Sequence, residues 1–168
     1  MTFTMEIQKR NLTLREAEII SKEIRLTNNI IGYKTGELVD FKNTFIATDG
    51  KALVGILTYV ELEHWIDLKI LIILKEYRGK GYGKELFDYS FEKAEELNKS
   101  LYTVTRNPVL VSLLEEKGFG GTSLSKLPIS VILHQAKMIF SIYRIKEYIR
   151  KRPEIKRGEK FQYFALRR

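Results

Sequence analysis

The sequence predicts one mixed α/β domain in which helices cover a central sheet, and three observations support this prediction. Its 168 residues, 44% of them apolar, match the size and composition of one folded domain. Apolar residues recur with helical spacing in some segments and alternate with polar residues in others. These segments follow one another as helix, three strands, helix, strand and helix, without an internal repeat or a low-complexity linker. We therefore expect residues 1–168 to form a single domain.

The first helix is expected to begin at Thr13. Thr13 and Glu16 have the spacing of a capping box, and Ile19, Ile20 and Ile24 supply one apolar face. Two extended runs follow on either side of Asp49-Gly50, a dipeptide that suits the positive φ angles of a tight hairpin turn. The chain therefore begins with a helix and a hairpin.

Residues 65–73 form the third expected strand. Its residues alternate, which predicts two faces: Ile66, Leu68, Ile70 and Ile72 on one, and Trp65, Asp67, Lys69, Leu71 and Ile73 on the other.

A glycine-rich loop leads into a second expected helix, whose apolar residues have the spacing of a face that packs on a sheet: Leu86, Phe87, Tyr89, Ala94 and Leu97. Residues 101–105 read as a short buried strand. A third helix follows, with Asn107 as its cap, Pro108 at its first position and Gly118 closing its end.

The pattern changes after Phe119. Residues 120–128 look like a loop, and residues 129–152 predict one long basic helix, followed by a last strand near residues 161–167. The apolar stripe of this helix would comprise Ile132, Ala136, Ile139, Tyr143 and Ile149. Cations would surround the stripe at Lys137, Arg144, Lys146, Arg150, Lys151 and Arg152.

Composition narrows the possible functions. The chain has no cysteine, which fits a reducing compartment and excludes thiolate metal sites, and His64 and His134 have no metal-ligand spacing. No segment has the length of a secretion signal core or a membrane span, so we expect a cytoplasmic protein without a bound metal. The formal net charge of +8 favours anionic partners, including phosphorylated cofactors, nucleic acid and acidic lipid headgroups.

The loop between the third strand and the second helix has the composition of a phosphate-binding loop. Three glycines alternate with other residues from Arg78 to Lys84, immediately before a helix begins. The first amides of a helix have no intrahelical acceptor and carry partial positive charge, and glycine lets a phosphate approach them. Arg78, Lys80 and Lys84 add positive charge around the same amides.

Two common nucleotide loops do not fit this spacing. A Walker loop needs Ser or Thr after its lysine, but Glu85 follows Lys84. A dinucleotide fold needs Gly-x-Gly-x-x-Gly after the first strand of its sheet, whereas this loop follows the third expected strand.

The loop does match Arg/Gln-x-x-Gly-x-Gly/Ala through Arg78, Gly81 and Gly83, and here the sequence resembles the GNAT superfamily of acyl-CoA-dependent N-acyltransferases. The segment "NPVLVSLLEEKGF" resembles the family's second block, an Asn-led helix that ends in Gly-Phe. Together with the order of elements upstream, the resemblance covers residues 5–119. It implies a mixed, mostly antiparallel sheet, an acyl-CoA-binding core in residues 1–119, and a divergent segment, residues 120–168, with an extra basic helix.

The resemblance also assigns cofactor contacts. It implies that the diphosphate of coenzyme A or acetyl-CoA binds the amides of Gly79, Lys80, Gly81, Tyr82, Gly83 and Lys84, next to Arg78 at the first motif position. It further implies that the preceding strand bulges and diverges from its parallel neighbour, so that its backbone from Leu71 to Ile73 receives the cofactor arm and stabilises the thioester oxygen. Asn107 matches the asparagine that contacts this arm.

Transfer to an amine requires a group that accepts the amine's proton. Asp67 is the best candidate, because it lies on the strand that leads to the loop and is expected to share a face with Leu71 and Ile73. The other interpretation is an acid paired with Lys69, and Glu61 or Glu63 could act through water instead. Without cysteine, and with no serine paired to a base, we expect direct attack in a ternary complex.

The sequence departs from the family at the residue that would protonate the leaving thiolate. Leu114 occupies the position where the family usually has tyrosine, and leucine cannot donate a proton. Ser112, Tyr82, Tyr102 or water could replace it, or the chain could bind coenzyme A without efficient catalysis.

The acceptor is expected to be an amine on a small molecule or a protein, and net positive charge disfavours a polycation. For residues 134–152 the simplest interpretation is a helix packed on the domain with a solvated basic face. The alternatives are contact with nucleic acid or an acidic partner, an interfacial membrane helix, and a homodimer contact. A non-catalytic adaptor that binds coenzyme A and uses this helix for a partner is the alternative function.

Overall fold

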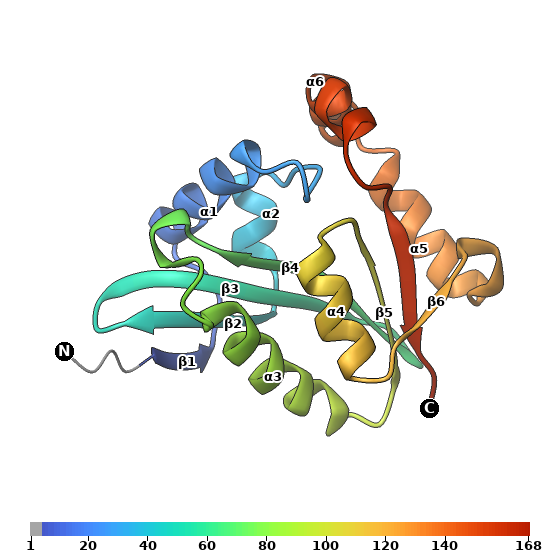
Figure 1. Cartoon of the computed structure of the whole chain (residues 1–168), viewed down its shortest axis with the longest axis horizontal. Helices are drawn as coiled ribbons and strands as arrows, with labels where there is room; N and C mark the ends of the chain where they lie inside the picture. The colour runs from blue at the N-terminus through green and yellow to red at the C-terminus, as the bar shows by residue number, and fades with distance from the viewer. Residues whose placement is uncertain (1–4) are drawn as a thin grey trace.

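The computed structural model describes residues 5–168 and contains one seven-stranded sheet flanked by helices (Figure 1). Residues 1–4 of the expected domain lie outside the described residues. The strands are β1 (Met5–Lys9), β2 (Asn43–Asp49), β3 (Ala52–Glu61), β4 (Trp65–Ile73), β5 (Ser100–Thr105), β6 (Gly120–Thr122) and β7 (Gln162–Leu166). The α-helices are α1 (Leu14–Leu26), α2 (Thr35–Asp40), α3 (Tyr82–Glu95), α4 (Pro108–Glu116), α5 (Ile129–Ile139) and α6 (Ile142–Arg157).

The sheet is mixed and mostly antiparallel, which confirms the predicted fold class. Its strand order is β1-β2-β3-β4-β5-β7-β6, and only β4 and β5 run parallel. β7, from the end of the chain, inserts between β5 and β6. The divergent C-terminal segment therefore completes the same sheet as the first 119 residues.

Three apolar clusters hold the layers together. One packs α3 and α4 against one face of the sheet and includes Phe45, Leu86, Phe87 and Leu113. Another packs α1 and α2 against the opposite face, and a smaller one joins Trp65 and Tyr102 to Val131 of α5. The two faces of the parallel β4–β5 pair are thus covered by different helices, α3 and α4 on one face and α5 on the other.

The predicted capping box at the start of α1 is confirmed. The Thr13 hydroxyl accepts the amide of Glu16 at 3.3 Å, and Oε2 of Glu16 accepts the amide of Thr13 at 2.9 Å. Ile20 and Ile24 face the core as expected, but Ile19 is exposed. The error arises because Ile19 lies next to Ile20 in sequence and therefore about 100° away around the helix.

Acid should weaken this helix start. Arg10 donates to both oxygens of Glu16 at 2.7 and 2.8 Å, and this pairing lowers the pKa of Glu16 to about 2. Because the folded pKa lies below the unfolded value, the stabilisation is complete above pH 4.5 and is lost as the pH falls toward 2. We expect Glu16→Gln to remove about 1–2 kcal/mol of unfolding free energy at pH 7 and little at pH 2.5. Urea unfolding at both pH values measures this, and an equal loss at both would contradict it.

The expected hairpin is present, and two further elements join it that the sequence pattern did not reveal. Gly50 adopts a φ of 57° in the turn between β2 and β3. β1 pairs with β2 at the sheet edge, and α2 lies between the first expected helix and the hairpin, where no element was expected. Both are short, and their alternation or helical spacing is correspondingly weak.

A β-bulge in β4 overturns the predicted faces of this strand. Thr58 pairs with Ile70 and Tyr59 with Leu68, so Lys69 is an extra residue without an opposite partner. The alternation therefore changes side at Lys69. Ile66 and Leu68 share the α3 and α4 face with Leu71 and Ile73, whereas Ile70 and Ile72 pack under α1 and α2.

The same bulge corrects the expected position of Asp67. Asp67 does not share a face with Leu71 and Ile73; its carboxylate instead contacts Tyr102 and Gln135 beneath α5. Side chains of a strand alternate strictly between the two faces of the sheet only where the pairing with the neighbouring strand has no bulge.

α3 and α4 lie close to their predicted positions. In α3, Leu86, Phe87 and Ala94 are buried, but Tyr89 is exposed, and so is Leu97, which lies beyond the end of the helix. Asn107 caps α4, Pro108 is its first residue, and Gly118 closes it with a φ of 84°.

The long basic helix predicted for residues 129–152 is in fact two helices, α5 and α6, and α6 continues to Arg157. The chain leaves the helical conformation at Ser141, and Arg144 donates to the carbonyl of Met138 at 3.3 Å, near the end of α5. The expected apolar stripe is also wrong, because Ile139 and Ile149 are exposed. Gly120–Thr122, expected to be loop, forms β6. In residues 5–168, no helix is both long and apolar enough to cross a bilayer.

Candidate functional site

The loop between β4 and α3 forms a cradle of main-chain amides. Gly79 and Gly81 have φ angles of 76° and 85°, which only glycine adopts without strain. Gly81 is the cap of α3, so the amides of Tyr82 and Gly83 belong to its first turn and have no intrahelical acceptor. The amide of Lys84 donates to the Gly81 carbonyl at 3.0 Å, which narrows the open cradle to residues 79–83.

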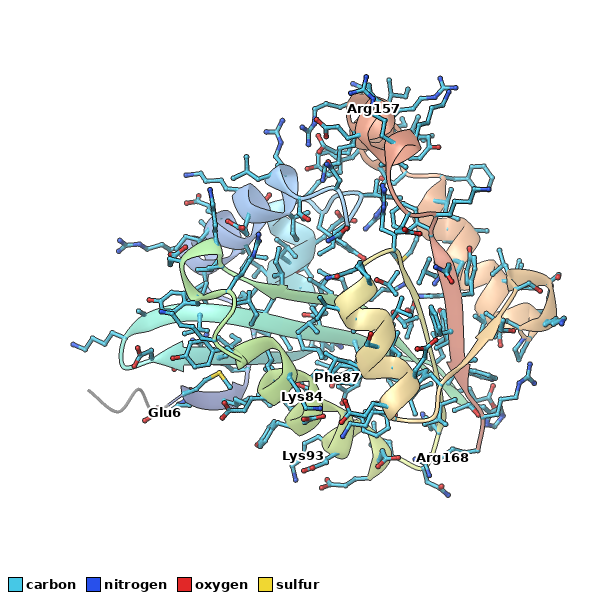
Figure 2. The ribbon with its side chains drawn as sticks, in the orientation of Figure 1. Glu6, Lys84, Phe87, Lys93, Arg157 and Arg168 are labelled. Carbon is cyan, nitrogen blue, oxygen red and sulfur yellow. The ribbon has the colours of Figure 1, made fainter. Side chains whose placement is uncertain are left out.

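Arg78 and Lys84, two of the cations at this loop, contact carboxylates. Arg78 donates to the Ile73 carbonyl at 2.9 Å and pairs with Glu23 of α1. Lys84, labelled in Figure 2, contacts Glu116 of α4 at 2.8 Å. Lys80 lies over the Tyr77 ring, 5.6 Å from its centre. The loop therefore offers an anion mainly its backbone N–H groups and the charge of the helix end.

β4 and β5 diverge immediately before this loop. They pair from Trp65 to Leu68 and from Ser100 to Thr103; beyond that point β4 pairs only with β3, and β5 only with β7. The hydroxyl of Thr103 donates to the Leu68 carbonyl at 2.8 Å, where the strands separate. The predicted bulge and divergence of this strand are therefore present.

The register fixes which backbone groups face the opening. The amide of Leu74 donates to the Val54 carbonyl at 2.9 Å, and opposite residues in an antiparallel ladder alternate between bonded and non-bonded pairs. Counting back along β4, Ile72 bonds with β3, whereas Leu71 and Ile73 direct their N–H and C=O groups away from β3. Both residues therefore present backbone groups on the side where β5 has diverged.

Asn107 lies on the other side of the opening, where β5 ends and α4 begins. Its Oδ1 accepts the amide of Val109 at 3.1 Å, and its own amide donates to the Thr105 hydroxyl at 3.1 Å. The cap fixes the side chain at this position, and the contact with a cofactor arm stays a prediction.

Asp67 is the centre of a buried polar cluster. It is 1% exposed, and its Oδ2 accepts hydrogen bonds from the Tyr102 hydroxyl at 2.7 Å and from Nε2 of Gln135 at 3.2 Å. The Lys69 ammonium pairs with the same oxygen, and Nε2 of His134 lies 3.2 Å from it. The ion pair between Asp67 and Lys69, one of the two interpretations of Asp67, is therefore present, and a role for Asp67 as proton acceptor stays a prediction.

Burial controls the protonation of this cluster. It lowers the pKa of the Lys69 ammonium, which the Asp67 carboxylate partly offsets. Burial, reinforced by the charge of Asp67, raises the pKa of the Tyr102 hydroxyl far above its usual value. Tyr102 is therefore a poor proton donor to a thiolate, since its proton is already donated to Asp67.

The other candidate donors and bases lie as follows. Leu114 is fully buried in the core, and the Ser112 hydroxyl donates to the Pro108 carbonyl at 3.2 Å. Tyr82 packs in the cluster under α3. Glu61 pairs with Lys99 at 2.7 Å, at the end of β4 opposite the glycine loop, and Glu63 is almost fully exposed.

Sequence reasoning missed the contributions of α5. His134 and Gln135 contact Asp67 although they lie 67 and 68 positions further along the chain, and no motif spacing links them to β4. The Asp67–Lys69 spacing was the available signal for a strand-borne ion pair. Within residues 5–168, no group of three or more His, Cys, Asp or Glu side chains is arranged to hold a metal ion.

Comparison with known proteins places this geometry in a family. The sequence matches the Acetyltransferase (GNAT) family over residues 8–119. No curated protein matches it significantly.

Solved structures share the fold at low sequence identity. The chain superposes on N-acetylglutamate synthase from Neisseria gonorrhoeae, solved with coenzyme A and N-acetyl-glutamate, with a TM-score of 0.69 and 14% identity. The match covers 98% of this chain but 35% of that one, so this chain spans about a third of that enzyme's length.

Two further structures match over nearly their whole length. The ribosomal-protein-S18-alanine N-acetyltransferase of Escherichia coli gives a TM-score of 0.65 at 12% identity, covering 98% of this chain and 94% of that one. The yncA protein of Salmonella typhimurium, solved with acetyl-CoA, gives a TM-score of 0.62 at 13% identity, and the match covers 97% of this chain and 93% of that one. With a family match over residues 8–119, a mixed sheet that opens between β4 and β5, and a glycine loop at that opening, the chain belongs to the GNAT acetyltransferase family.

Proposed function

We propose that this chain transfers an acetyl group from acetyl-CoA to a primary amine, by direct attack of the amine in a ternary complex. The observation that carries the proposal is the continuity of two features. The strand that lines the opening between β4 and β5 is joined to the amide cradle of residues 79–83 by one short segment, which contains a 3-10 turn at Lys75–Tyr77. A long cofactor with a diphosphate near one end and a thioester at the other fits this continuity.

The diphosphate of the cofactor would bind the amides of Gly79, Gly81, Tyr82 and Gly83, where the charge of the helix end favours an anion. The cofactor arm would then follow β4 backward, along the outward-facing backbone of Ile73 and Leu71. An amide of this segment would donate to the thioester oxygen as negative charge develops on it. Asn107 would contact the arm from the β5 side.

Removal of the amine's proton would involve Asp67 through His134. Because the Asp67 carboxylate is almost fully buried, an amine does not reach it directly. The His134 side chain is 22% exposed, and its Nε2, which is buried and forms no hydrogen bond within the described residues, lies 3.2 Å from the carboxylate. A proton taken by His134 would create an imidazolium that Asp67 stabilises, which is a common division of labour between His and Asp.

Asp67→Asn should lower turnover roughly 100-fold near pH 7 and leave acetyl-CoA binding within about twofold. The defect should shrink as pH rises, because more of the amine is then already uncharged. Asp40→Asn, the same substitution at an exposed carboxylate at the end of α2, is the matched control and should behave like the unchanged protein. Steady-state rates across pH, with thermal unfolding of each variant, measure this. An unchanged rate in the asparagine variant would remove Asp67 from the mechanism.

Arg106, next to Asn107, supports an acceptor that carries an anionic group. Its guanidinium is buried and stacks on the Phe161 ring at 5.5 Å. Within the described residues its Nη1 has no hydrogen-bond partner. A buried cation without a counter-charge is costly, and a carboxylate on the acceptor would relieve that cost.

The experiment that tests the proposal is thiol release from acetyl-CoA with a panel of amino acids, their amides, polyamines, amino sugars and peptides. We expect release with at least one acceptor and a preference for amines that carry a carboxylate. Intersecting initial-rate lines would support the ternary complex, and parallel lines would contradict it. Binding of coenzyme A without release for any acceptor would favour the adaptor function instead. A cytoplasmic location stays a prediction.

A further inference from the structure

Helix α6 buries two charged residues and exposes most of its isoleucines, which is unusual for a helix at the surface of a domain. Glu147 and Lys151, one turn apart, face the protein and are buried. Three of the four isoleucines of the same helix, Ile142, Ile145 and Ile149, are exposed, Ile142 by 74%. A helix that packs on a domain usually buries its apolar residues, so the outward face needs a separate explanation.

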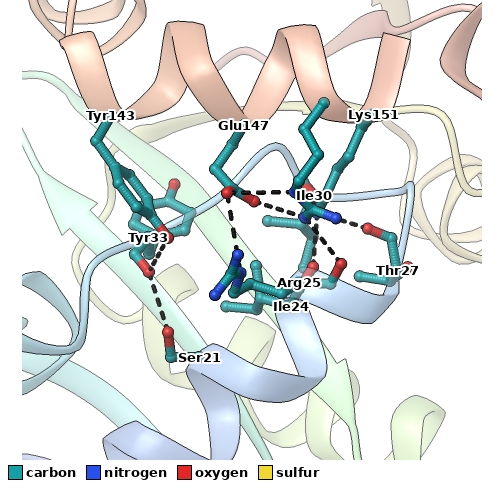
Figure 3. A network of polar contacts seen from close by, with 10 residues as sticks. Ser21, Ile24, Arg25, Thr27, Ile30, Tyr33, Tyr143, Glu147 and Lys151 are labelled. Carbon is teal, nitrogen blue, oxygen red and sulfur yellow. Dashed lines mark hydrogen bonds and ion pairs between the residues drawn. The ribbon is translucent and has the colours of Figure 1, made fainter. Parts of the chain in front are cut away.

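Polar contacts hold α6 in this orientation. The Lys151 ammonium donates to the carbonyls of Ile24, Thr27 and Ile30, each at 2.7 Å, as Figure 3 shows. Glu147 pairs with Arg25 of α1 and Arg150 of α6, and the Tyr143 hydroxyl donates to the Tyr33 carbonyl. These contacts fix the rotation of α6 about its axis, so the apolar residues cannot turn inward without breaking them.

We define the outer face of α6 as Ile142, Ile145, Lys146, Ile149, Arg152 and Lys156, all of which are exposed. Positions 142, 145, 149, 152 and 156 are separated by three or four residues and therefore form one stripe, with Lys146 beside it. Within residues 5–168, no carboxylate forms an ion pair with its three cations. The outer face thus combines three isoleucines with three uncompensated positive charges.

We propose that the outer face of α6 binds the surface of an anionic lipid bilayer. Isoleucines that enter the boundary between headgroups and acyl chains, flanked by cations at headgroup level, are the signature of a helix that lies in the membrane interface. A second copy of the chain fits less well, because two faces with three cations each, on chains of net charge +8, repel one another. Nucleic acid fits less well too, because phosphates would cover the isoleucines without burying them in an apolar medium.

The outer face lies apart from the amide cradle. Figure 2 labels Lys84, in the first turn of α3, and Arg157, at the end of α6, and the two lie well apart in this view. Lipid binding and cofactor binding should therefore be separable by mutation, and this inference does not rest on the proposed acetyl transfer.

The test is cosedimentation of the full chain with vesicles of phosphatidylcholine alone or with about 30% phosphatidylglycerol. We expect binding to the anionic vesicles that weakens with added salt, and little binding to the neutral ones. Lys146→Gln with Lys156→Gln should weaken binding at least tenfold, since each cation near an anionic surface contributes roughly fivefold. The control pair, Lys22→Gln with Lys51→Gln, removes two exposed lysines elsewhere and should change binding by less than about threefold.

An apolar pair of variants tests the isoleucines separately. Ile142 and Leu14 are each the first residue of a helix, and they are 74% and 64% exposed. Ile142→Ser should weaken vesicle binding about fivefold or more, whereas Leu14→Ser should leave it unchanged. Thermal unfolding should show both variants folded.

Four results would overturn the inference. The first is no binding to anionic vesicles, and the second is equal binding to neutral and anionic vesicles. The third is a loss of vesicle binding in the control variants equal to the loss in the outer-face variants. The fourth is salt-sensitive binding to RNA or DNA at lower concentration than to vesicles. Self-association abolished by Ile142→Ser, without vesicle binding, would assign the outer face to a dimer and would also overturn it.

Discussion

Gly83→Asp should lower the affinity for coenzyme A at least 100-fold while leaving the protein folded. Gly83 lies in the first turn of α3 with ordinary helical φ, and a side chain there would meet only Ile73, at 3.5 Å. An acidic residue in the first helical turn is favourable for the helix, because it complements the partial positive charge there. The same carboxylate would occupy and repel the site of the cofactor's diphosphate. Isothermal titration calorimetry with coenzyme A measures the loss.

Gly83→Ala is the matched control. It adds a methyl group without charge, and the motif that the loop resembles accepts alanine here, so affinity should stay within about threefold. In thermal unfolding, the midpoint temperature of the Asp variant should equal or exceed that of the unchanged protein. Undiminished affinity in the Asp variant would show that the diphosphate does not bind this cradle.

Lys151→Met should lower the free energy of unfolding by roughly 3 kcal/mol. Lys151 is 1% exposed and supplies donors to three carbonyls at the end of α1 and in the segment that follows it. Methionine keeps the apolar stem but leaves those carbonyls without this donor. Lys146→Met, the same substitution at an exposed position of the same helix, should change stability by less than about 0.5 kcal/mol.

The effect of Lys151 should also depend on pH. Burial lowers the pKa of Lys151 to about 8 from its usual 10.5. Between these values the unfolded chain binds more protons than the folded chain, so the contribution of Lys151 to stability rises with pH. The difference between the unchanged protein and Lys151→Met should therefore widen from pH 7 to pH 9.5 in urea unfolding. A constant difference would show that this amine titrates normally in the folded state.

Local sequence signals predicted the elements whose ends are fixed by local chemistry. The capping box of Thr13, the turn at Gly50 and the Asn107 cap each depend on residues within a few positions of one another, and each is present. The amide cradle could be predicted for the same reason, since a helix end and its glycines are contiguous in sequence.

Longer-range features could not be predicted in this way. The bulge at Lys69 depends on pairing with β3, and it moved Asp67 to the face opposite Leu71 and Ile73. The orientation of α6 depends on carbonyls more than a hundred residues away, which Lys151 caps, so helical periodicity alone assigned the wrong buried stripe. The packing of α5 brings His134 to Asp67 of β4, and no local pattern in the sequence predicts this contact.

One titration tests most directly the claim that backbone amides of the β4–α3 loop hold the cofactor by its diphosphate. The folded protein is titrated by calorimetry with acetyl-CoA and, in parallel, with S-acetylpantetheine, which has the thioester and the arm but no diphosphate. We predict one binding site for acetyl-CoA, with a dissociation constant on the order of 1 μM to 1 mM, and at least 100-fold weaker binding of S-acetylpantetheine. No heat with acetyl-CoA, or equal affinity for the two ligands, would contradict this account.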